Sequence, residues 1–294
     1  MARVLPSVVQ ITTSEGLGSG VVFDAKGDIV TNAHVVGSAK NVHVRLPSAS
    51  KTLAARVLGV FVPDDLAVIR VENPPATLRP ATFAKSSAVR VGEIVLAMGN
   101  PLGLTGTVTD GIVSATGRNV SEGQGGSAVI ISAIQTSAAI NPGNSGGALV
   151  SLSGQVIGIP TLAASDPQMG GAAVGIGFAI PSDTVTSIAP QLIATGAVTN
   201  SGRAALGVTV ETVADPSGQP AGVGVVSVKA GGPADQAGIR AGDVILAVNG
   251  QPTDSVSALQ SALATHKPGD QVKVRLSRDG SQHTVTATLG TLTG

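Results

Sequence analysis

Short aliphatic runs, each followed within a few residues by glycine, proline, asparagine or aspartate, fill the first 180 residues of the chain. They include residues 20–23, 42–46, 66–71, 93–97 and 155–159. Runs of this length and spacing predict β-strands joined by turns, because those turn residues interrupt regular structure. No alternation of strands with longer helical patterns accompanies them. We therefore expect an all-β barrel or sandwich in this part of the chain.

A helical pattern begins only at Ser182, the expected N-cap, and ends at Gly196. Its apolar residues are Val185, Ile188, Ala189, Leu192 and Ile193. The polar stretch that follows is suited to a linker at about residues 198–203. A chain of 294 residues is also longer than one small core usually organises. We therefore predict two domains, residues 1–198 and 199–294.

The last ninety residues have the pattern of a small α+β unit. The apolar run 244–248 leads into Asn249-Gly250, a pair typical of a type I′ turn. Proline at 233 and glycine at 238 bound a short helix. A longer helix carries Val256, Leu259 and Leu263, is capped by Asp254 or Ser255, and stops at Pro268. Two further strands are expected at 272–276 and 284–289.

Composition excludes several classes of protein. Lys plus Arg and Asp plus Glu both number 18, so no basic excess attracts nucleic acid, and no nucleic-acid partner is expected. Four phenylalanines are the only aromatic residues, which disfavours recognition by stacking on rings. No cysteine is present, which removes disulfides, thiolate zinc sites and cysteine nucleophiles. We expect no metal and no cofactor.

The beginning of the chain has neither a membrane span nor a secretory signal. No run of 18 or more apolar residues occurs, and residues 1–3 lead directly into an expected strand at 4–11. We therefore expect the chain to be a piece of a longer protein.

One serine has an unusual setting. Ser145 lies in the segment NPGNSGG, residues 141–147. Each glycine costs up to about 1 kcal/mol of chain entropy relative to alanine, but glycine lets the backbone fold tightly and approach another group closely. A serine hydroxyl is a weak nucleophile at neutral pH and needs an adjacent base. Ser145 is therefore a candidate nucleophile that requires a histidine nearby.

Four histidines are candidates for that base. His43 alternates within an expected strand, His266 ends a helix, and His283 lies beside a turn, so none of these three has a distinctive setting. His34 differs, because an expected strand breaks at Asn32 into a short turn that would hold the imidazole at a barrel rim. We take His34 as the candidate base.

The carboxylate that orients this base could come from Asp64 or Asp65. Asp65 immediately precedes the strand 66–71, whereas Asp64 completes a Pro-Asp turn. We prefer Asp65 for that reason. Without the other two residues, the pair would be interpreted as two solvated loop aspartates.

Five segments in the same order resemble the successive motifs of the HtrA (DegP-like) serine proteases. They are TNAHVV at 31–36, DLAVI at 65–69, GNPLGL at 99–104, TVTDGIVS at 107–114 and NPGNSGGAL at 141–149. Two further segments, RAALGV at 203–208 and GPADQAGIRAGDVI at 232–245, resemble the PDZ domain of these proteases. The resemblance implies a mainly β fold: a chymotrypsin-like double β-barrel followed by one small α+β PDZ domain.

The resemblance also implies roles for single residues. His34, Asp65 and Ser145 would form a catalytic triad, and the backbone N–H groups of Gly143 and Ser145 would form the oxyanion hole. Ile140 would line the primary substrate pocket, with Ile176 nearby and Gly177 within a strand edge, 175–178, that faces the substrate backbone. Such an aliphatic pocket favours valine, alanine or leucine. In the PDZ domain, the N–H groups of Leu206, Gly207 and Val208 would hold a C-terminal carboxylate, and Leu259 or Leu263 would select an apolar terminal side chain.

The function implied is that of an ATP-independent serine endopeptidase of protein quality control. It would cleave unfolded or misfolded proteins, while C-terminal peptides bind the PDZ domain for recruitment or allosteric control. A homotrimer or higher oligomer and an extracytoplasmic location follow from the same resemblance, with an anchor in an N-terminal segment outside this chain. The alternatives are a peptide-binding chaperone or scaffold with a latent protease fold, and an esterase.

Asn144 carries a regulatory hypothesis. Digestive relatives of this fold have aspartate before the nucleophile, and that carboxylate pairs with a newly cleaved N-terminus. A neutral amide cannot form the full ion pair, so no obligatory N-terminal cleavage is expected. Control would act through the ordering of loops at about 99–110, 138–144 and 161–175.

Overall fold

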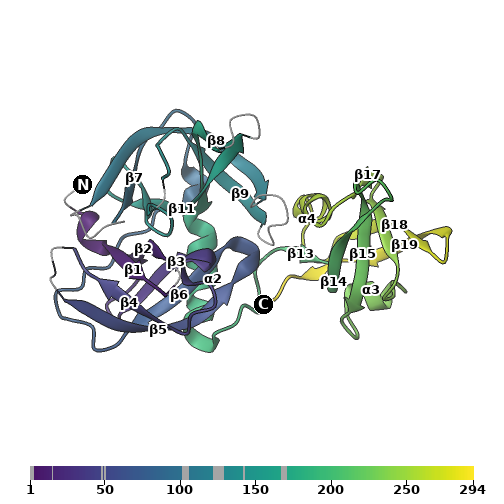
Figure 1. The fold of residues 1–294 in the computed structure, drawn as a ribbon, viewed down its shortest axis with the longest axis horizontal. Helices are drawn as coiled ribbons and strands as arrows, with labels where there is room; N and C mark the ends of the chain where they lie inside the picture. Colours follow the sequence, from purple (N-terminus) through teal and green to yellow (C-terminus); the bar gives the residue numbers. More distant parts are fainter. Residues whose placement is uncertain are drawn as a thin grey trace. The chain divides into compact units, whose positions relative to one another are not determined.

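The computed structural model describes residues 3–14, 16–47, 49, 51–100, 106–121, 129–141, 143–166 and 171–294. These residues form two compact units, Met1–Val198 and Thr199–Gly294 (Figure 1). The first unit contains two closed β-barrels, and the second contains a single main sheet with two helices. The predicted fold class, a double β-barrel followed by an α+β unit, is confirmed.

The first barrel uses the N-terminal strands. They are β1 (Val8–Thr12), β2 (Leu17–Val22), β3 (Asp28–Asn32), β4 (Asn41–Arg45), β5 (Thr52–Phe61) and β6 (Leu66–Val71). Their order around the barrel is β1-β2-β3-β6-β5-β4, and neighbouring strands are antiparallel. Aliphatic side chains fill the interior, with Ile11, Ile29 and Ile69 among the largest that are fully buried.

The second barrel repeats this construction. Its strands are β7 (Ile94–Gly99), β8 (Thr107–Ser121), β9 (Val129–Thr136), β10 (Ala148–Ser151), β11 (Val156–Asp166) and β12 (Gly171–Pro181). They close in the order β10-β11-β12-β9-β8-β7, again antiparallel. Ile134, Leu149 and Ile157 belong to its core. Each barrel therefore has its own apolar core, which does not depend on the polar side chains at its rim.

Short helices occupy the connections: η1 (Leu5–Ser7), α1 (Ala33–Val36), η2 (Val62–Asp64) and η3 (Ser86–Ala88). The long helix α2 (Ser182–Thr195) packs against strands of both barrels, β5, β6 and β11 (Figure 1). One strand over residues 4–11 was expected, but this is wrong for its first half, because η1 begins with Leu5-Pro6 and the strand starts at Val8.

The expected N-cap of α2 is also wrong. Ser182 is the first helical residue and Pro181 is the N-cap. The Ser182 hydroxyl donates instead to the carbonyl oxygen of Ala84, at 2.7 Å, and so ties α2 to the connection between the barrels. Gly196 ends the helix as predicted, in the left-handed conformation with φ of 76°.

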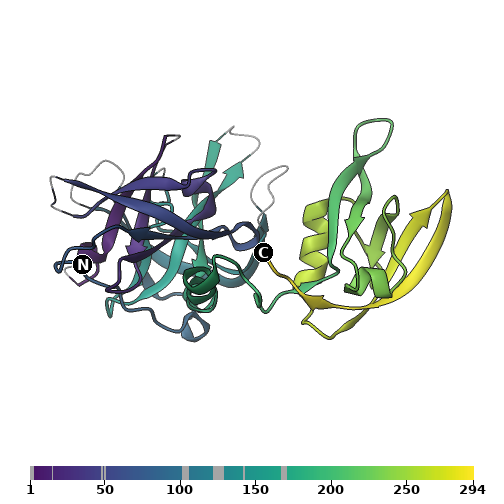
Figure 2. The same cartoon turned by 90° about the horizontal axis from the view of Figure 1, so that it is seen from below.

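The second unit has a main sheet in the order β14-β15-β16-β18-β19. These strands are β14 (Val208–Ala214), β15 (Pro220–Val228), β16 (Val244–Val248), β18 (Gln271–Arg278) and β19 (Ser281–Thr288); β17 (Gln251–Pro252) pairs with β16, and β13 (Ala204–Ala205) pairs with β20 (Gly290–Thr291). The helices are α3 (Pro233–Gln236) and α4 (Val256–Ala264), and α4 lies along the sheet next to β14 (Figure 2). Strand β14 is an edge strand.

Two local predictions in this unit are confirmed. Asn249 and Gly250 both have positive φ, 48° and 83°, between the paired strands β16 and β17. Of the two candidate caps for α4, Ser255 is the N-cap, and its hydroxyl accepts the Ala258 N–H at 3.2 Å. Among the described residues, no helix is both long enough and apolar enough to cross a membrane.

A buried carboxylate stabilises the second unit. Asp243 accepts two hydrogen bonds from the Arg278 guanidinium, both at 2.7 Å, and one from the Arg240 N–H at 2.8 Å. The hydrogen bonds from Arg278 lower the pKa of Asp243 below its ordinary value, against the opposing effect of burial. A carboxylate with a lowered pKa contributes stability above its ordinary pKa and loses it as the pH falls through the lowered value.

We expect Asp243→Asn to lower the free energy of unfolding by about 1.5 to 3 kcal/mol at pH 7, the usual value of a hydrogen bond to a charged group. The difference from the wild type should shrink as the pH falls from about 5 toward 3, because the Asp243 carboxylate of the unfolded chain then takes up a proton more readily than that of the folded state, whose pKa is lowered. Thermal unfolding of both proteins across this pH range measures the effect. A difference that stays constant down to pH 3 would contradict the assignment.

Candidate active site

His34 is placed by the break between β3 and α1. Asn32 ends the strand in an extended conformation and occupies the N-cap position of α1, as expected, but its side chain does not cap the helix. Its Nδ2 group donates instead to the carbonyl oxygen of Asp65, at 3.1 Å. The Ala33 N–H donates to the same oxygen at 3.0 Å. The turn that carries His34 is therefore held against the segment that carries Asp65.

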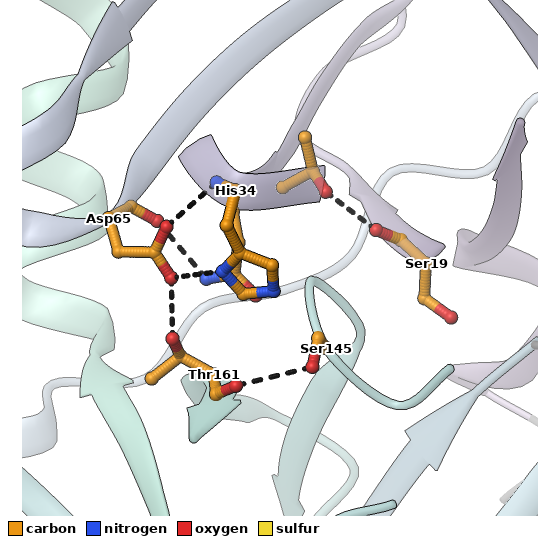
Figure 3. A network of polar contacts seen from close by, with 7 residues as sticks. Ser19, His34, Asp65, Ser145 and Thr161 are labelled. Carbon is orange, nitrogen blue, oxygen red and sulfur yellow. Dashed lines mark hydrogen bonds and ion pairs between the residues drawn. The ribbon is translucent and has the colours of Figure 1, made fainter. Parts of the chain in front are cut away.

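Asp65 lies between η2 and β6 with its backbone in the left-handed conformation, φ 50°. Aspartate tolerates this conformation better than most residues. Its side chain is only 3% exposed and accepts three hydrogen bonds. Oδ1 accepts the His34 N–H at 3.0 Å, whereas Oδ2 accepts from His34 Nδ1 at 2.8 Å and from the Thr161 hydroxyl (Figure 3).

The contact with Asp65 determines the tautomer of His34. An ionised carboxylate only accepts hydrogen bonds, so Nδ1 carries the proton in the neutral imidazole, and Nε2 is left as the acceptor. Figure 3 shows Nε2 on the side of the ring toward Ser145. The His34 side chain is 34% exposed, so the ring is accessible from solvent.

Ser145 comes from the loop that precedes β10, and Figure 3 draws it on the Nε2 side of the His34 ring. Its hydroxyl donates to the carbonyl oxygen of Thr161 at 3.2 Å. The carbonyl oxygen of Ser145 accepts the Ser19 N–H of the first barrel at 2.9 Å. Thr161 thus links Ser145 to the Asp65 carboxylate that holds His34, so that an alcohol, an imidazole and a carboxylate from three distant segments belong to one hydrogen-bond network. These are the groups that an activated serine nucleophile needs.

The glycines of the Ser145 loop allow close packing as well as tight turning. Gly143 and Gly146 have positive φ, 104° and 79°. A Cβ atom on Gly146 would lie 2.2 Å from the Ser19 carbonyl oxygen, and one on Gly147 would lie 2.1 Å from the Met98 carbonyl oxygen. A side chain at either position would push the loop away from its two neighbouring strands.

The structure brings two of the three expected pocket residues, Ile140 and Gly177, into contact. Ile140 is buried, and its side chain packs against Gly177 so closely that a Cβ atom there would lie 2.4 Å from Ile140 Cγ1. Ile176 is 38% exposed. The expected free strand edge over 175–178 is wrong for Gly177 and Phe178, because both pair with β9 on one side and with β11 on the other.

Asn144 is buried and bonded within its own loop. Its Nδ2 group donates to the Ala139 carbonyl oxygen at 3.2 Å, and its N–H donates to the Asn141 carbonyl oxygen at 3.0 Å. The Thr109 hydroxyl donates to the same Ala139 oxygen at 2.8 Å. Of the loops expected to exert control, residues 101–105, 142 and 167–170 lie outside the described residues.

In the second unit, the loop before β14 turns its carbonyl groups inward. The carbonyl oxygens of Leu206 and Gly207 accept the N–H groups of Ala234 and Lys229, at 2.8 and 2.9 Å. In a trans peptide the following N–H points the opposite way, so the N–H groups of Gly207 and Val208 face away from these donors. The hydrogen bond from the Lys229 N–H to the Gly207 carbonyl oxygen makes Val208 and Val228 a non-hydrogen-bonded pair of β14 and β15. The N–H and C=O groups of Val208 therefore point toward the open edge of β14.

The side chains of the helix beside that edge are less accessible than expected. Leu259 is 2% exposed and Leu263 is 9% exposed, and both belong to the core of the unit. Among the described residues, no group of three or more histidine, aspartate or glutamate side chains is placed to hold a metal ion.

Sequence reasoning missed two residues of the candidate site, Thr161 and Ser19. Thr161 donates to Asp65 and its carbonyl oxygen accepts from Ser145, so it touches two of the three candidate residues. Ser19 is fully buried and bonds to the Ser145 loop. The sequence signal for Thr161 is a hydroxyl within an apolar strand, and that for Ser19 is a hydroxyl between Gly18 and Gly20, and neither by itself singles out a site.

Comparisons with known proteins identify two domain families. Residues 18–159 match the trypsin-like peptidase domain, and residues 204–289 match the PDZ domain. The trypsin-like match contains His34, Asp65 and Ser145, and the PDZ match contains the loop before β14.

Several relatives match nearly the whole chain. It is 40% identical to the periplasmic pH-dependent serine endoprotease DegQ of Escherichia coli, over 95% of this chain and 60% of DegQ. It is 41% identical to the serine protease PepD of Mycobacterium tuberculosis, over 98% of this chain and 65% of PepD. It is also 41% identical to the serine protease Do-like HtrA of Lactococcus lactis, over 91% of this chain and 69% of that protein. The chain thus spans less than two thirds of DegQ and of PepD.

One solved structure is similar to nearly the whole chain. The crystal structure of the serine endoprotease from Yersinia pestis matches with a TM-score of 0.63 and 37% identity, over 99% of this chain and 96% of that chain.

Proposed function

Because the chain belongs to the HtrA family of serine proteases, we propose that it is an ATP-independent serine endopeptidase of protein quality control, which cleaves unfolded or exposed polypeptides. One network of contacts carries this proposal: the buried Asp65 carboxylate holds both His34 Nδ1 and the Thr161 hydroxyl, and the Thr161 carbonyl oxygen accepts from the Ser145 hydroxyl (Figure 3). We propose the same two domains as the sequence predicted, a protease domain over 1–198 and a PDZ domain over 199–294.

In the proposed mechanism, the Ser145 oxygen attacks the scissile carbonyl carbon while its proton passes to His34 Nε2. His34 then gives this proton to the leaving amine, and Asp65 holds the tautomer and stabilises the imidazolium. The N–H groups of Gly143 and Ser145 bind the oxyanion, where one donor typically contributes about 3 kcal/mol in the transition state. Water then releases the acyl group by the same steps.

Substrate selection is proposed to depend on Ile140, with Gly177 and Ile176 beside it. The buried Ile140 side chain offers an apolar wall, which favours valine, alanine or leucine before the cleaved bond. Gly177 contributes by leaving room for Ile140, since its backbone is already paired on both sides.

The second unit is proposed to bind C-terminal peptides by adding a strand to the open edge of β14. The N–H groups of Leu206, Gly207 and Val208 would hold the terminal carboxylate, supported by the outward direction of the last two. Because Leu259 and Leu263 are largely buried, they would form the floor of an apolar groove rather than its rim.

The assembly and location are also proposals. DegQ is named as periplasmic, which supports the extracytoplasmic location that we propose for this chain. A membrane anchor in an N-terminal segment is a further part of this proposal. We propose a homotrimer or higher oligomer. The bonds of Asn144 within its own loop support activity without obligatory N-terminal cleavage.

The function is tested by incubating the chain with casein and with a fluorophosphonate reagent, beside Ser145→Ala. We expect casein cleavage and covalent labelling by the wild type alone, with most cleavage after valine, alanine or leucine. Casein binding without cleavage or labelling would favour the chaperone alternative. Cleavage mainly after charged residues would contradict the pocket assignment.

The pH dependence of turnover should follow His34. Only the neutral imidazole accepts the Ser145 proton, and an ordinary imidazole has a pKa of about 6.5. We therefore expect kcat/KM to rise as the pH increases through about 6 to 7. Initial rates with a peptide substrate measure this, and a flat profile over that window would exclude His34 as the base.

Thr161 should support catalysis through its hydrogen bond to Asp65. Thr161→Val removes the hydroxyl that donates to the buried carboxylate, a hydrogen bond to a charged group worth about 1.5 to 3 kcal/mol. We expect kcat to fall about 10- to 100-fold with little change in KM, and Thr161→Ser to keep most of the activity. Equal kcat values for Thr161→Val and the wild type would refute this role.

A further inference from the structure

Ser19 of β2 joins three segments through one small, fully buried side chain. Its hydroxyl donates to the Gly143 carbonyl oxygen at 2.5 Å and accepts the Asn100 N–H at 2.8 Å. Its own N–H donates to the Ser145 carbonyl oxygen at 2.9 Å, and its carbonyl oxygen accepts the Thr31 hydroxyl at 2.7 Å. Figure 3 shows Ser19 beside the loop that carries Ser145.

Two of these four bonds reach Gly143 and Ser145, the residues whose N–H groups are assigned to the oxyanion. A bond to a carbonyl oxygen fixes the orientation of the peptide plane that follows the residue. The Ser19 hydroxyl does this for Gly143, and the Ser19 N–H does it for Ser145. Ser19 therefore restrains the peptide group that follows Gly143 and the one that follows Ser145, next to both proposed oxyanion donors.

Gly143 is the less constrained of the two. It has no side chain and a φ of 104°, so its backbone is limited by few steric contacts of its own. The Ser19 hydroxyl supplies a restraint from outside the loop. Oxyanion donors are effective when they are already oriented before charge develops, because no energy is then spent on turning them.

Ser19 is fully buried, and its backbone packs closely against the loop that carries Ser145. Gly146 approaches the Ser19 backbone so closely that a Cβ atom would lie 2.2 Å from its carbonyl oxygen. Alanine would fit the same space but would leave the Gly143 oxygen and the Asn100 N–H without their shared partner. The hydroxyl, rather than the volume of the side chain, is the feature that the loop uses.

We propose that Ser19 is a positioning residue, whose hydroxyl holds Gly143 so that the oxyanion donors are oriented before substrate binds. This inference rests on the proposed protease function. It predicts that loss of the hydroxyl weakens binding of the transition state and leaves binding of the substrate nearly unchanged.

The test compares Ser19→Ala with Ser182→Ala, in the whole chain. Ser182 is a matched control, because it is also fully buried and its hydroxyl also donates to a backbone carbonyl oxygen far along the sequence. We measure kcat and KM on a peptide substrate, the inhibition constant of a peptide boronic acid, and thermal unfolding. Ser19→Cys is measured in parallel, since it fills the same space with a weaker donor.

For Ser19→Ala we expect kcat to fall about 10- to 100-fold, the effect of a small misplacement of catalytic groups. KM should change less than two-fold, and the boronic acid should bind more weakly by the same factor as kcat. Ser19→Cys should lie between Ser19→Ala and the wild type, and Ser182→Ala should keep the wild-type kcat. If Ser19→Ala does not fold, Ser19→Cys alone must show the selective loss of kcat.

The inference is overturned if the Ser19 variants lose stability but keep the kcat of Ser182→Ala, or if KM rises as much as kcat falls. Failure of the proposed function has a different signature. In that case Ser145→Ala would cleave the substrate as fast as the wild type, and the Ser19 inference would fail with it.

Discussion

Replacing Ser145 with alanine is expected to lower kcat about 10⁶-fold, the loss seen when the nucleophile of a serine protease is removed. The remaining rate would come from the oxyanion donors and from substrate binding, which act without the nucleophile. The fold should be retained, because the bond that the hydroxyl donates to the Thr161 carbonyl oxygen is long, at 3.2 Å, and its loss removes little stability. Rates on a peptide substrate and thermal unfolding measure the two effects separately.

Ser153→Ala is a suitable control for this experiment. Ser153 lies in the loop after β10, in the same barrel, and its exposed hydroxyl forms hydrogen bonds with the side chains of Ser151 and Gln155. Its alanine variant should have wild-type activity. A Ser145→Ala protein that keeps more than a tenth of the wild-type kcat, after contaminating protease is excluded, would remove Ser145 from the mechanism.

Asp65→Asn is expected to lower kcat about 10⁴-fold, because an amide in this position favours the wrong imidazole tautomer. Asp65 accepts from His34 Nδ1, from the His34 N–H and from the Thr161 hydroxyl, and all three need an acceptor. An asparagine side chain has one oxygen and one NH₂ group, so it cannot serve them all. It also removes the negative charge that stabilises the imidazolium.

Asp64→Asn makes the same chemical change one residue earlier and distinguishes the two aspartates that the sequence left as alternatives. We expect it to lower kcat less than 10-fold. Rates for both variants are measured at pH 7.5 with a saturating peptide substrate, and thermal unfolding checks that each is folded. Comparable losses in the two variants would show that the Asp65 effect is not specific.

The strands and turns of both domains could be predicted from local patterns. Aliphatic runs of four to eight residues form strands wherever turn residues bound them, and this explains the barrels around Ile69 and Ile157. The positive φ at Asn249 and Gly250 follows from the same local chemistry. The errors occurred where long-range contacts override local preference, as at Ser182, whose hydroxyl bonds to Ala84 rather than capping its own helix.

The candidate site was predictable in part for a different reason. His34, Asp65 and Ser145 stand in motifs with distinctive neighbours, such as the glycines around Ser145. Thr161 has no such neighbours, and Ser19, although Gly18 and Gly20 flank it, has no base or carboxylate beside it in the sequence, so neither hydroxyl points to a site until the opposing segment is known. The free strand edge expected at Gly177 failed likewise, since pairing with both β9 and β11 is a property of the closed barrel.

The sequence by itself determined the mainly β architecture, the family resemblance and the three residue types able to activate a hydroxyl, because these depend on short segments. Only the tertiary structure decided that Asp65 meets His34, that Thr161 supports that carboxylate, and that Ser19 of one barrel holds the Ser145 loop beside the other. Such contacts join residues about 30 to 125 positions apart, at distances set by how the two barrels close and not by any local preference.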